Sequence, residues 1–326
     1  MKGFWPLAVG AIFVWCHSAS AQDNAPAKCT LGLVAVLPLT VLPDGRVATP
    51  VSLSGRNAYL TIDTGDIISV ITDRMAALLG VRQFFSYLQF AFPGGVVAKN
   101  YATVADLKIG NLHAASYNFW VVPDRGGGGT DGLLGPDILS AYDADFDFSS
   151  NKLALFDKHH CPGQVVYWAP NYGAVPMTVQ KDGHITVKVY LDGKPVDALV
   201  DTGAYKSTLD ASIAKSLFGI DKDTPGVTST TAALNGGESA AMYHYKFASM
   251  AFADVAVRNP DIDIVPDDHN LSGMPPLVIG INVLRALHLY IAYGESMLYV
   301  TAAEAKADAQ PVSAPAAAPP KSATRQ

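Results

Sequence analysis

The sequence predicts an all-β protein built from two homologous, barrel-like lobes with a cleft between them. Two observations predict this fold: the chain repeats itself, and each copy consists of short apolar strands separated by glycine-containing turns. A third observation predicts the site, because each copy carries the same polar tripeptide at the end of a strand. Ligands usually bind in clefts between domains, so a site between the lobes is expected.

The repeat is centred on Asp-Thr-Gly, which occurs at 63–65 and again at 201–203. Without a gap, residues 38–79 align with 176–217 and share 14 identities. Several of the other aligned pairs keep an apolar residue opposite an apolar residue. Because self-similarity of this kind indicates a duplicated architecture, the two halves are expected to fold alike.

Each copy begins with two hairpins. A strand runs into an Asp-Gly turn, at 44–45 in the first copy and at 182–183 in the second, and this dipeptide is a strong hairpin signal. A second strand ends at another tight turn, at 54–55 and 192–193. The third strand delivers Asp-Thr-Gly at its end, so a buried strand fixes the position of the aspartate.

The middle of each copy is expected to hold a short helix and then a hairpin. The helices are predicted over "DRMAALLG" (73–80) and "DASIAKSLFG" (210–219). Beyond them, each copy has a strand broken by two adjacent glycines, which we interpret as the tip of a projecting hairpin. These glycines are Gly94 and Gly95 in the first copy, and Gly236 and Gly237 in the second.

A second shared signature closes each copy. "GLLGPDIL" (132–139) corresponds to "LVIGINVL" (277–284): two aliphatic residues and a glycine precede Asp or Asn, an aliphatic residue and Leu. Strand-like sequence follows in both copies. The copies meet at "DKHHCPGQ" (157–164), which is interpreted as a short polar linker.

The two ends of the chain are set apart from the lobes. Residues 1–21 combine an early lysine, an apolar run and Ala-Ser-Ala, which is typical of a secretory signal peptide, and the apolar run is too short to span a bilayer. Residues 302–326 are rich in Ala and Pro without periodicity and are predicted to be a disordered tail. The lobes are therefore assigned to 22–158 and 159–301, and the mature protein is expected in the periplasm or outside the cell.

Composition excludes several classes of protein. Hydrophobic residues at 49% and charged residues at 16% describe a globular chain. The net charge of −6 offers no basic surface for nucleic acid, and no segment after the signal peptide is apolar enough for a membrane. Cys29 and Cys161 remain after cleavage and are predicted to form a disulfide in an oxidising compartment; two separate thiols are the alternative.

No metal or cofactor is predicted. His-His-Cys at 159–161 offers three possible zinc ligands, but no second cluster stands at ligand spacing. The glycine-rich stretch at 125–132 lacks the Gly-Lys-Ser/Thr of a phosphate-binding loop. A linker and a flexible loop are the simpler interpretations.

Two aspartates at the ends of rigid strands predict acid–base chemistry. Carboxyl groups that face each other at a few ångströms cannot both ionise, so they share one proton. The ionised member can take a proton from a water while the protonated member donates to a substrate carbonyl oxygen. The sequence therefore predicts that Asp63 and Asp201 are the catalytic pair of a hydrolase.

The twofold occurrence of Asp-Thr-Gly with a downstream aliphatic-aliphatic-Gly resembles the aspartic proteases, over about residues 32–301. The units are most similar to the retropepsin-like group, in which one unit dimerises, whereas two units share one chain in pepsin. The resemblance implies an aspartic endopeptidase that cleaves peptides or proteins as a monomer, with Gly94, Gly95, Gly236 and Gly237 at the tips of two flaps. It also implies a set of residues that support the dyad: Thr64, Gly65, Gly135, Thr202, Gly203 and Gly280.

Asp66 departs from the family pattern, since this position usually holds a small residue such as Ala204 of the second copy. A third carboxylate near the pair would disfavour its anionic form and raise the working pH. A solvated turn residue is the alternative.

Two other interpretations of the whole chain stay open. The protein could be a catalytically silent module that binds peptides in the same interlobe cleft. Equivalent halves of two chains could also pair with each other, although the short linker favours one chain that folds on itself.

Overall fold

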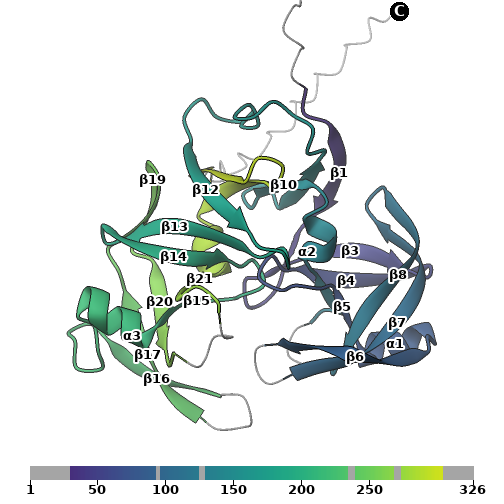
Figure 1. Cartoon of the computed structure of the whole chain (residues 1–326), viewed down its shortest axis with the longest axis horizontal. Coiled ribbons are helices and arrows are strands. Elements are labelled where there is room, and N and C mark those ends of the chain that lie inside the picture. The colour runs from purple at the N-terminus through teal and green to yellow at the C-terminus, as the bar shows by residue number, and fades with distance from the viewer. Residues whose placement is uncertain (1–29, 93–95, 125–128, 234–238, 268–272, 304–326) are drawn as a thin grey trace, which may run out of the picture.

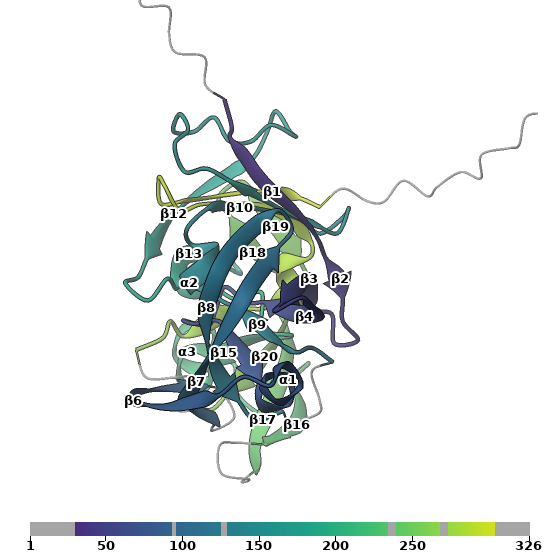
Figure 2. The same ribbon diagram turned by 90° about the vertical axis from the view of Figure 1, so that its right-hand side faces the viewer.

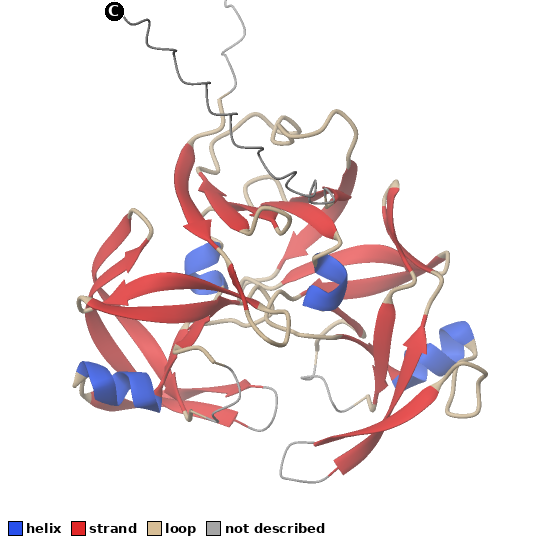
Figure 3. Cartoon of the chain, turned by 180° about the vertical axis from the view of Figure 1, so that it is seen from behind, coloured by secondary structure: helices blue, strands red, loops and turns tan. Residues whose placement is uncertain are grey.

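The computed structural model describes residues 30–92, 96–124, 129–233, 239–267 and 273–303. Nearly all regular structure in these residues is β-strand, as predicted, and the helices are few and short (Figure 3). The strands of the first half are β1 (Leu33–Pro38), β2 (Thr40–Val41), β3 (Val47–Leu53), β4 (Arg56–Ile62), β5 (Val70–Thr72), β6 (Gln83–Phe92), β7 (Val96–Ile109), β8 (Leu112–Val122), β9 (Gly132–Leu134), β10 (Asp143–Asp147) and β11 (Lys152–Phe156).

The second half repeats this order with small changes. Its strands are β12 (Gly173–Val179), β13 (Ile185–Leu191), β14 (Lys194–Val200), β15 (Ser207–Asp210), β16 (Thr228–Ala233), β17 (Ser239–Lys246), β18 (Ser249–Phe252), β19 (Val255–Arg258), β20 (Asp261–Val265), β21 (Leu277–Ile279), β22 (Leu287–Ala292) and β23 (Met297–Ala302). The helices of the whole described chain are α1 (Asp73–Leu79), α2 (Pro136–Leu139), α3 (Ala211–Ile213), which continues as η1 (Ala214–Phe218), and α4 (Ile281–Leu284).

The first lobe closes into a six-stranded barrel. Strands β3, β4, β9, β5, β8 and β7 pair in that order, and β7 returns to β3, where Val51 lies opposite Ile109. Alternate residues of these strands point inward, so the barrel is filled by fully buried side chains such as Leu60 and Phe119. The predicted helix forms as α1, begins at the side chain of Thr72, and ends at Gly80, whose φ of 65° suits a glycine.

The second lobe forms the same ring from more pieces. Strands β13, β14, β21, β15, β20 and β17 pair in that order, and the ring returns to β13 through β18, where Leu191 lies opposite Met250. Two residues separate β17 from β18, and two more, including Pro260, separate β19 from β20. The helix predicted over 210–219 forms as α3 and η1.

The projecting hairpins that the sequence predicts are present in both lobes. Strands β6 and β7 are antiparallel up to the pair Phe92 and Val96, and β16 and β17 up to Ala233 and Ser239. The four glycines predicted at the two tips lie outside the described residues.

A six-stranded antiparallel sheet joins the two lobes, and the sequence did not predict it. Its order is β1, β11, β10, β22, β23 and β12, so each half contributes three neighbouring strands. Only the central pair, β10 with β22, crosses between the halves, with Phe146 opposite Leu289. Figure 1 shows this sheet above the two lobes. Figure 2 shows β1, the edge strand of the sheet, running toward β2.

The segment between the lobes is more than the polar linker that the sequence predicts. His160 is buried there, and its Nε2 lies 2.5 Å from the Asp143 carboxylate. Val165 and Trp168 pack against Tyr290 on the face of the joining sheet that points away from the main core. The segment therefore covers this face of the sheet, which explains why Val165 and Trp168 are apolar.

The ends of the chain and one predicted bond are not tested. The predicted signal peptide and most of the predicted tail lie outside the described residues, as does Cys29, so its disulfide with Cys161 stays a prediction. No helix among the described residues has the length and apolar character that a membrane span needs.

Candidate active site

The two Asp-Thr-Gly turns meet at the junction of the lobes because matching strands deliver them there. Strand β4 ends one residue before Asp63, and β14 ends one residue before Asp201. Each of these strands is paired in parallel with the strand of the second signature, β9 or β21. The Asp63 amide donates to the Leu134 carbonyl at 3.0 Å, and the Asp201 amide to the Ile279 carbonyl at 3.1 Å. The backbone of both aspartates is therefore held in place by the strands beside it.

The two threonines tie the turns together by four hydrogen bonds that cross between the lobes. The Thr64 hydroxyl donates to the Val200 carbonyl at 2.7 Å and accepts from the Thr202 amide at 3.1 Å. The Thr202 hydroxyl donates to the Ile62 carbonyl at 2.8 Å and accepts from the Thr64 amide at 3.1 Å. Both side chains are fully buried, so each lost bond would leave a buried polar group unpaired.

The two glycines let the carboxyl groups approach each other. A methyl group added to Gly65 would lie 2.1 Å from the carboxyl carbon of Asp201. A methyl group added to Gly203 would lie 2.1 Å from the carboxyl carbon of Asp63. Each carboxyl group therefore occupies the space where the opposite turn would carry a side chain, and only glycine leaves that space open.

Burial acts on the pKa of both aspartates. Burial raises the pKa of Asp63, and hydrogen bonds from the Gly65 amide and the Asp201 side chain oppose this effect. Burial and then the negative charge of Asp63 raise the pKa of Asp201 well above its ordinary value. Like charges in contact cannot both ionise, so burial of the two carboxyl groups favours a pair that holds one proton.

Asp66 is a third carboxyl group within this electrostatic environment. Burial, followed by the charges of Asp63, Asp201 and Asp137, raises the pKa of Asp66 to about 8. One of its carboxyl oxygens accepts a hydrogen bond from the Ile67 amide at 2.7 Å. Asp66 is partly buried, and its raised pKa favours the protonated carboxyl group at acidic pH. Its predicted effect on the working pH stays a prediction.

A serine and an aspartate hold the loop that follows the first turn. The Ser69 hydroxyl donates to the Asp137 carboxylate at 2.7 Å and accepts from the Gly135 amide at 2.9 Å. The Tyr117 hydroxyl donates to the same carboxylate at 2.6 Å. A methyl group on Gly135 would lie 2.8 Å from the carbonyl carbon of Ile68, so this glycine lets the second signature pack against the loop.

The second lobe uses the same arrangement with an amide. The Ser207 hydroxyl donates to the Asn282 side-chain oxygen at 2.9 Å and accepts from the Gly280 amide at 3.0 Å. The sequence predicts the two glycines but not Ser69, Ser207 and their partners. The signal was present, since the repeat aligns the two serines and places Asp137 and Asn282 at one position of the second signature.

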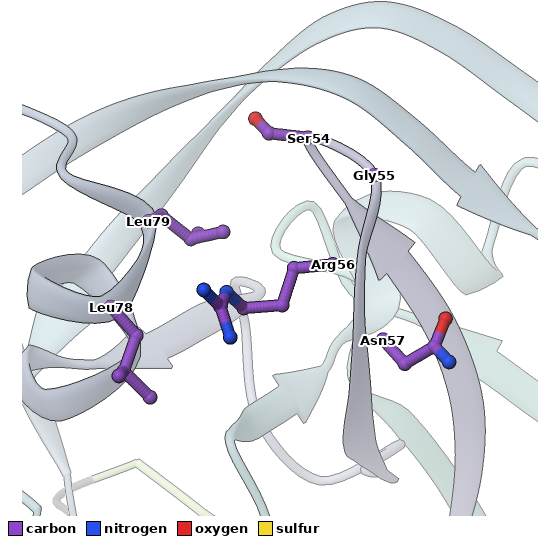
Figure 4. A pocket seen from close by; sticks show the side chains of 6 residues that line it. All are labelled: Ser54, Gly55, Arg56, Asn57, Leu78 and Leu79. Carbon is purple, nitrogen blue, oxygen red and sulfur yellow. The ribbon is translucent and has the colours of Figure 1, made fainter.

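Two surface pockets lie away from these residues. One, of about 480 Å³, is shown in Figure 4. Its lining residues are Ser54, Gly55, Arg56, Asn57, Leu78 and Leu79. The other, also about 480 Å³, lies on β12 to β14 of the second lobe. Neither is lined by a residue of the Asp-Thr-Gly turns, so the predicted interlobe cleft stays a prediction.

Two homologous β-lobes that each bring an Asp-Thr-Gly turn to their junction define the bilobal class of aspartic protease folds. A family model described as aspartyl protease matches residues 49–138 and 187–283, which is more than half of the chain. The chain therefore belongs to the aspartyl protease family, as the sequence predicts. The two matched regions contain both Asp-Thr-Gly turns and all but the last leucine of each second signature.

Two solved structures are similar to the chain at low sequence identity. The chain is similar to basic 7S globulin from soybean, with a TM-score of 0.50 and 10% identity over 83% of this chain and 95% of that one. It is also similar to conglutin gamma, a unique basic 7S globulin from lupine seeds, with a TM-score of 0.49, 11% identity and the same coverage. The likeness to the soybean protein shows the fold alone. A search of curated proteins finds no match to the sequence.

Proposed function

We propose that this member of the aspartyl protease family is an active endopeptidase that hydrolyses peptide bonds with Asp63 and Asp201. One observation carries the proposal: each carboxyl group lies against the glycine of the opposite turn. A protein that only bound peptides would have no use for two desolvated carboxyl groups in contact, because such a pair is costly unless it shares a proton.

The proposed reaction uses the different proton affinities of the two residues. Ionised Asp63 accepts a proton from a water as the water oxygen bonds to the peptide carbonyl carbon, and Asp201 donates its proton to the carbonyl oxygen. Asp201 then takes a proton back from a hydroxyl group of the tetrahedral intermediate. Asp63 gives its proton to the leaving nitrogen as the carbon–nitrogen bond breaks. The pair is thereby returned to its starting state, and no metal or covalent intermediate is needed.

The proposed substrate is an extended peptide or protein segment that lies across both lobes. Strand-like peptides gain affinity from main-chain hydrogen bonds and selectivity from pockets for alternate side chains. The two antiparallel hairpins, β6 with β7 and β16 with β17, would act as flaps over this segment. The proposal includes a monomer that acts in the periplasm or outside the cell.

The test is the cleavage of a mixed-peptide library by the mature chain from pH 3 to pH 8, with product ends identified by mass spectrometry. Asp63→Asn and Asp201→Asn variants are compared with Asp106→Asn, a control at an exposed carboxylate that pairs with Lys108. We expect each dyad variant to lose about 10²- to 10⁴-fold in rate, the range of general acid–base catalysis, and the control to keep wild-type activity.

Two outcomes contradict the proposal. If folded wild-type protein cleaves nothing at any pH, the endopeptidase assignment fails and the silent peptide-binding interpretation takes its place. If either dyad variant cleaves as fast as the wild type, the two turns do not form one catalytic pair.

A further inference from the structure

One side chain of the second lobe reaches the Asp63 turn directly. His184 follows the Asp-Gly turn between β12 and β13, is buried, and has its Nε2 2.9 Å from the carbonyl oxygen of Gly65. The turn itself is seated against the first lobe, since a methyl group on Gly183 would lie 2.5 Å from Cβ of Pro136. The contact therefore joins a fixed point of the second lobe to the middle of the first Asp-Thr-Gly turn.

The chemistry of the contact determines which ring atom carries a proton. A carbonyl oxygen only accepts hydrogen bonds, so Nε2 of His184 is the donor whether the ring is neutral or charged. The other ring nitrogen, Nδ1, lies 3.1 Å from the Asp182 carboxylate but has no hydrogen bond of good geometry. The bond to Gly65 is thus the one directed hydrogen bond of this buried ring.

The bond acts on a peptide group that also faces the catalytic pair. The Gly65 carbonyl belongs to the same planar peptide group as the Asp66 amide, and the two point in opposite directions. The Asp66 amide is one of the backbone groups that lower the pKa of Asp63. In the second lobe, the equivalent Ala204 amide donates to Asp201 at 2.9 Å. Holding the carbonyl on one side therefore directs the amide toward Asp63 on the other.

The first lobe has a different residue at the matching position. Arg46 aligns with His184 in the repeat and pairs with Asp44 at 2.7 Å, within its own turn. Its charge lowers the pKa of Asp63 through space. The two lobes thus act on Asp63 in two ways: Arg46 as a permanent charge, and His184 as a donor to the backbone.

We propose that His184 is a positioning residue of the site, which holds the Gly65–Asp66 peptide group so that its amide faces the Asp63 carboxylate. The inference rests on the proposed function for its catalytic meaning, but the hydrogen bond itself can be tested without activity. The family match to the second half begins at residue 187, so His184 lies outside it.

The charged and titratable groups around this contact are few. Asp182 lies on the same turn as His184, Asp63 and Asp66 flank Gly65, and Asp201 faces Gly65 from the second lobe. Asp137 stands on the helix against which the turn packs. Arg46 is the cation whose charge acts on Asp63. Because the other groups are acidic, removal of the donor is expected to weaken Asp63 as the anion rather than strengthen it.

The test compares three variants of the full chain. His184→Gln places an amide donor near the position of Nε2, His184→Asn places one near Nδ1 only, and His184→Ala has no donor. His113→Asn is the control, since His113 is exposed and its ring pairs with Asp106 on the first lobe. The measurements are kcat, KM, the acidic limb of the pH profile, the melting temperature, and hydrogen exchange at the amides of residues 64–66.

We expect His184→Ala and His184→Asn to lower kcat about tenfold with little change in KM, and to move the acidic limb to higher pH. We expect His184→Gln to stay within about threefold of the wild type. The Asp66 amide should exchange faster in the Ala and Asn variants than in the Gln variant. If the wild type has no peptidase activity, this exchange pattern alone supports the hydrogen bond.

Two results overturn the inference. One is a His184→Gln variant that loses as much activity and amide protection as His184→Asn, with the losses in both variants following the decrease in melting temperature. That result would mean that His184 acts by packing and not by its hydrogen bond. The other is a His184→Ala variant with wild-type kcat and wild-type exchange.

Discussion

The two lobes close their barrels in different ways, yet the threonines of their Asp-Thr-Gly turns make the same bonds. In the first lobe, β7 and β8 are unbroken strands of 14 and 11 residues. In the second lobe, the corresponding stretch is divided into β17, β18, β19 and β20, and Pro260 interrupts the ladder because it lacks an amide hydrogen. The outer hairpins have therefore diverged, while the strands that deliver the turns have kept the same length and pairing.

The differences that reach the site are few and concern charge. Where the first lobe has Asp66 and Asp137, the second has Ala204 and Asn282. The first turn therefore lies in the more acidic environment. The comparison indicates that the symmetric parts hold the pair together and that the asymmetric parts distinguish its two members.

The largest effect is expected where symmetry is strictest. Gly203→Ala and Gly65→Ala should each destabilise the protein by about 3 kcal/mol or more, because the new methyl group overlaps a carboxyl group of the opposite lobe. Denaturant unfolding measures the effect. Gly193→Ala is the control for backbone strain, since Gly193 has a positive φ of 77° and no atom near its added methyl. If either variant loses no more stability than the control, the two glycines do not have equivalent roles in the two lobes.

The threonines should give the next largest effect. Thr64→Val and Thr202→Val each remove two buried cross-lobe hydrogen bonds and leave a carbonyl and an amide unpaired, at a cost of about 1–3 kcal/mol. We expect similar losses in the two variants and a less than additive loss in the double variant, since both belong to one network. Thermal unfolding tests this, and strictly additive losses would show that the two hydroxyls act independently.

Substitution of the serines should have different effects in the two lobes. Ser69→Ala removes a hydroxyl from an aspartate, and Ser207→Ala removes one from an asparagine. Hydrogen bonds to a charged group contribute about 1.5–3 kcal/mol, and those between neutral groups about 1 kcal/mol. The first variant should therefore be the less stable one in urea unfolding at pH 7. Equal losses would mean that Asp137 and Asn282 act alike despite their charge.

Asp66 should give the effect that depends most on pH. The fold raises its pKa from an ordinary value of 3.8 to about 8, so between these values the folded protein binds a proton that the unfolded chain has released. Stability therefore falls as the pH rises through this window. Asp66→Asn should match the wild type near pH 4 and become more stable than the wild type by pH 8.

Melting temperatures measured across this pH range decide the point. Asp106→Asn, at an exposed carboxylate, is the control and should show no such gain. A gap between Asp66→Asn and the wild type that stays constant from pH 4 to pH 8 would contradict the assignment.

The sequence predicted the parts that the duplication repeats. The barrels, the strands that end at Asp63 and Asp201, and the short helices followed from local turns and alternation. These signals lie within one copy, and the second copy confirms each of them.

The joining sheet could not be predicted in the same way. Strands β10 and β22 are recognisable as strands, but nothing in either of them specifies the other as partner over so long a separation. The buried pair of Asp145 and His288, with Nε2 at 2.6 Å from the carboxylate, exists only because this pairing forms. The contact of His184 with Gly65 was missed for the same reason, since it requires the relative placement of the lobes.

The joining sheet also determines what a separated half would be. Each half contains three neighbouring strands of the sheet and a nearly complete barrel. Within the sheet, only the pairing of β10 with β22 joins a strand of one half to a strand of the other. An isolated half would expose the unpaired edge of one strand, and such an edge is a template for another chain. Two fragments made by cutting between β11 and β12 would therefore carry matching edges, which suits the chain to use as a split protein whose halves reassemble through β10 and β22.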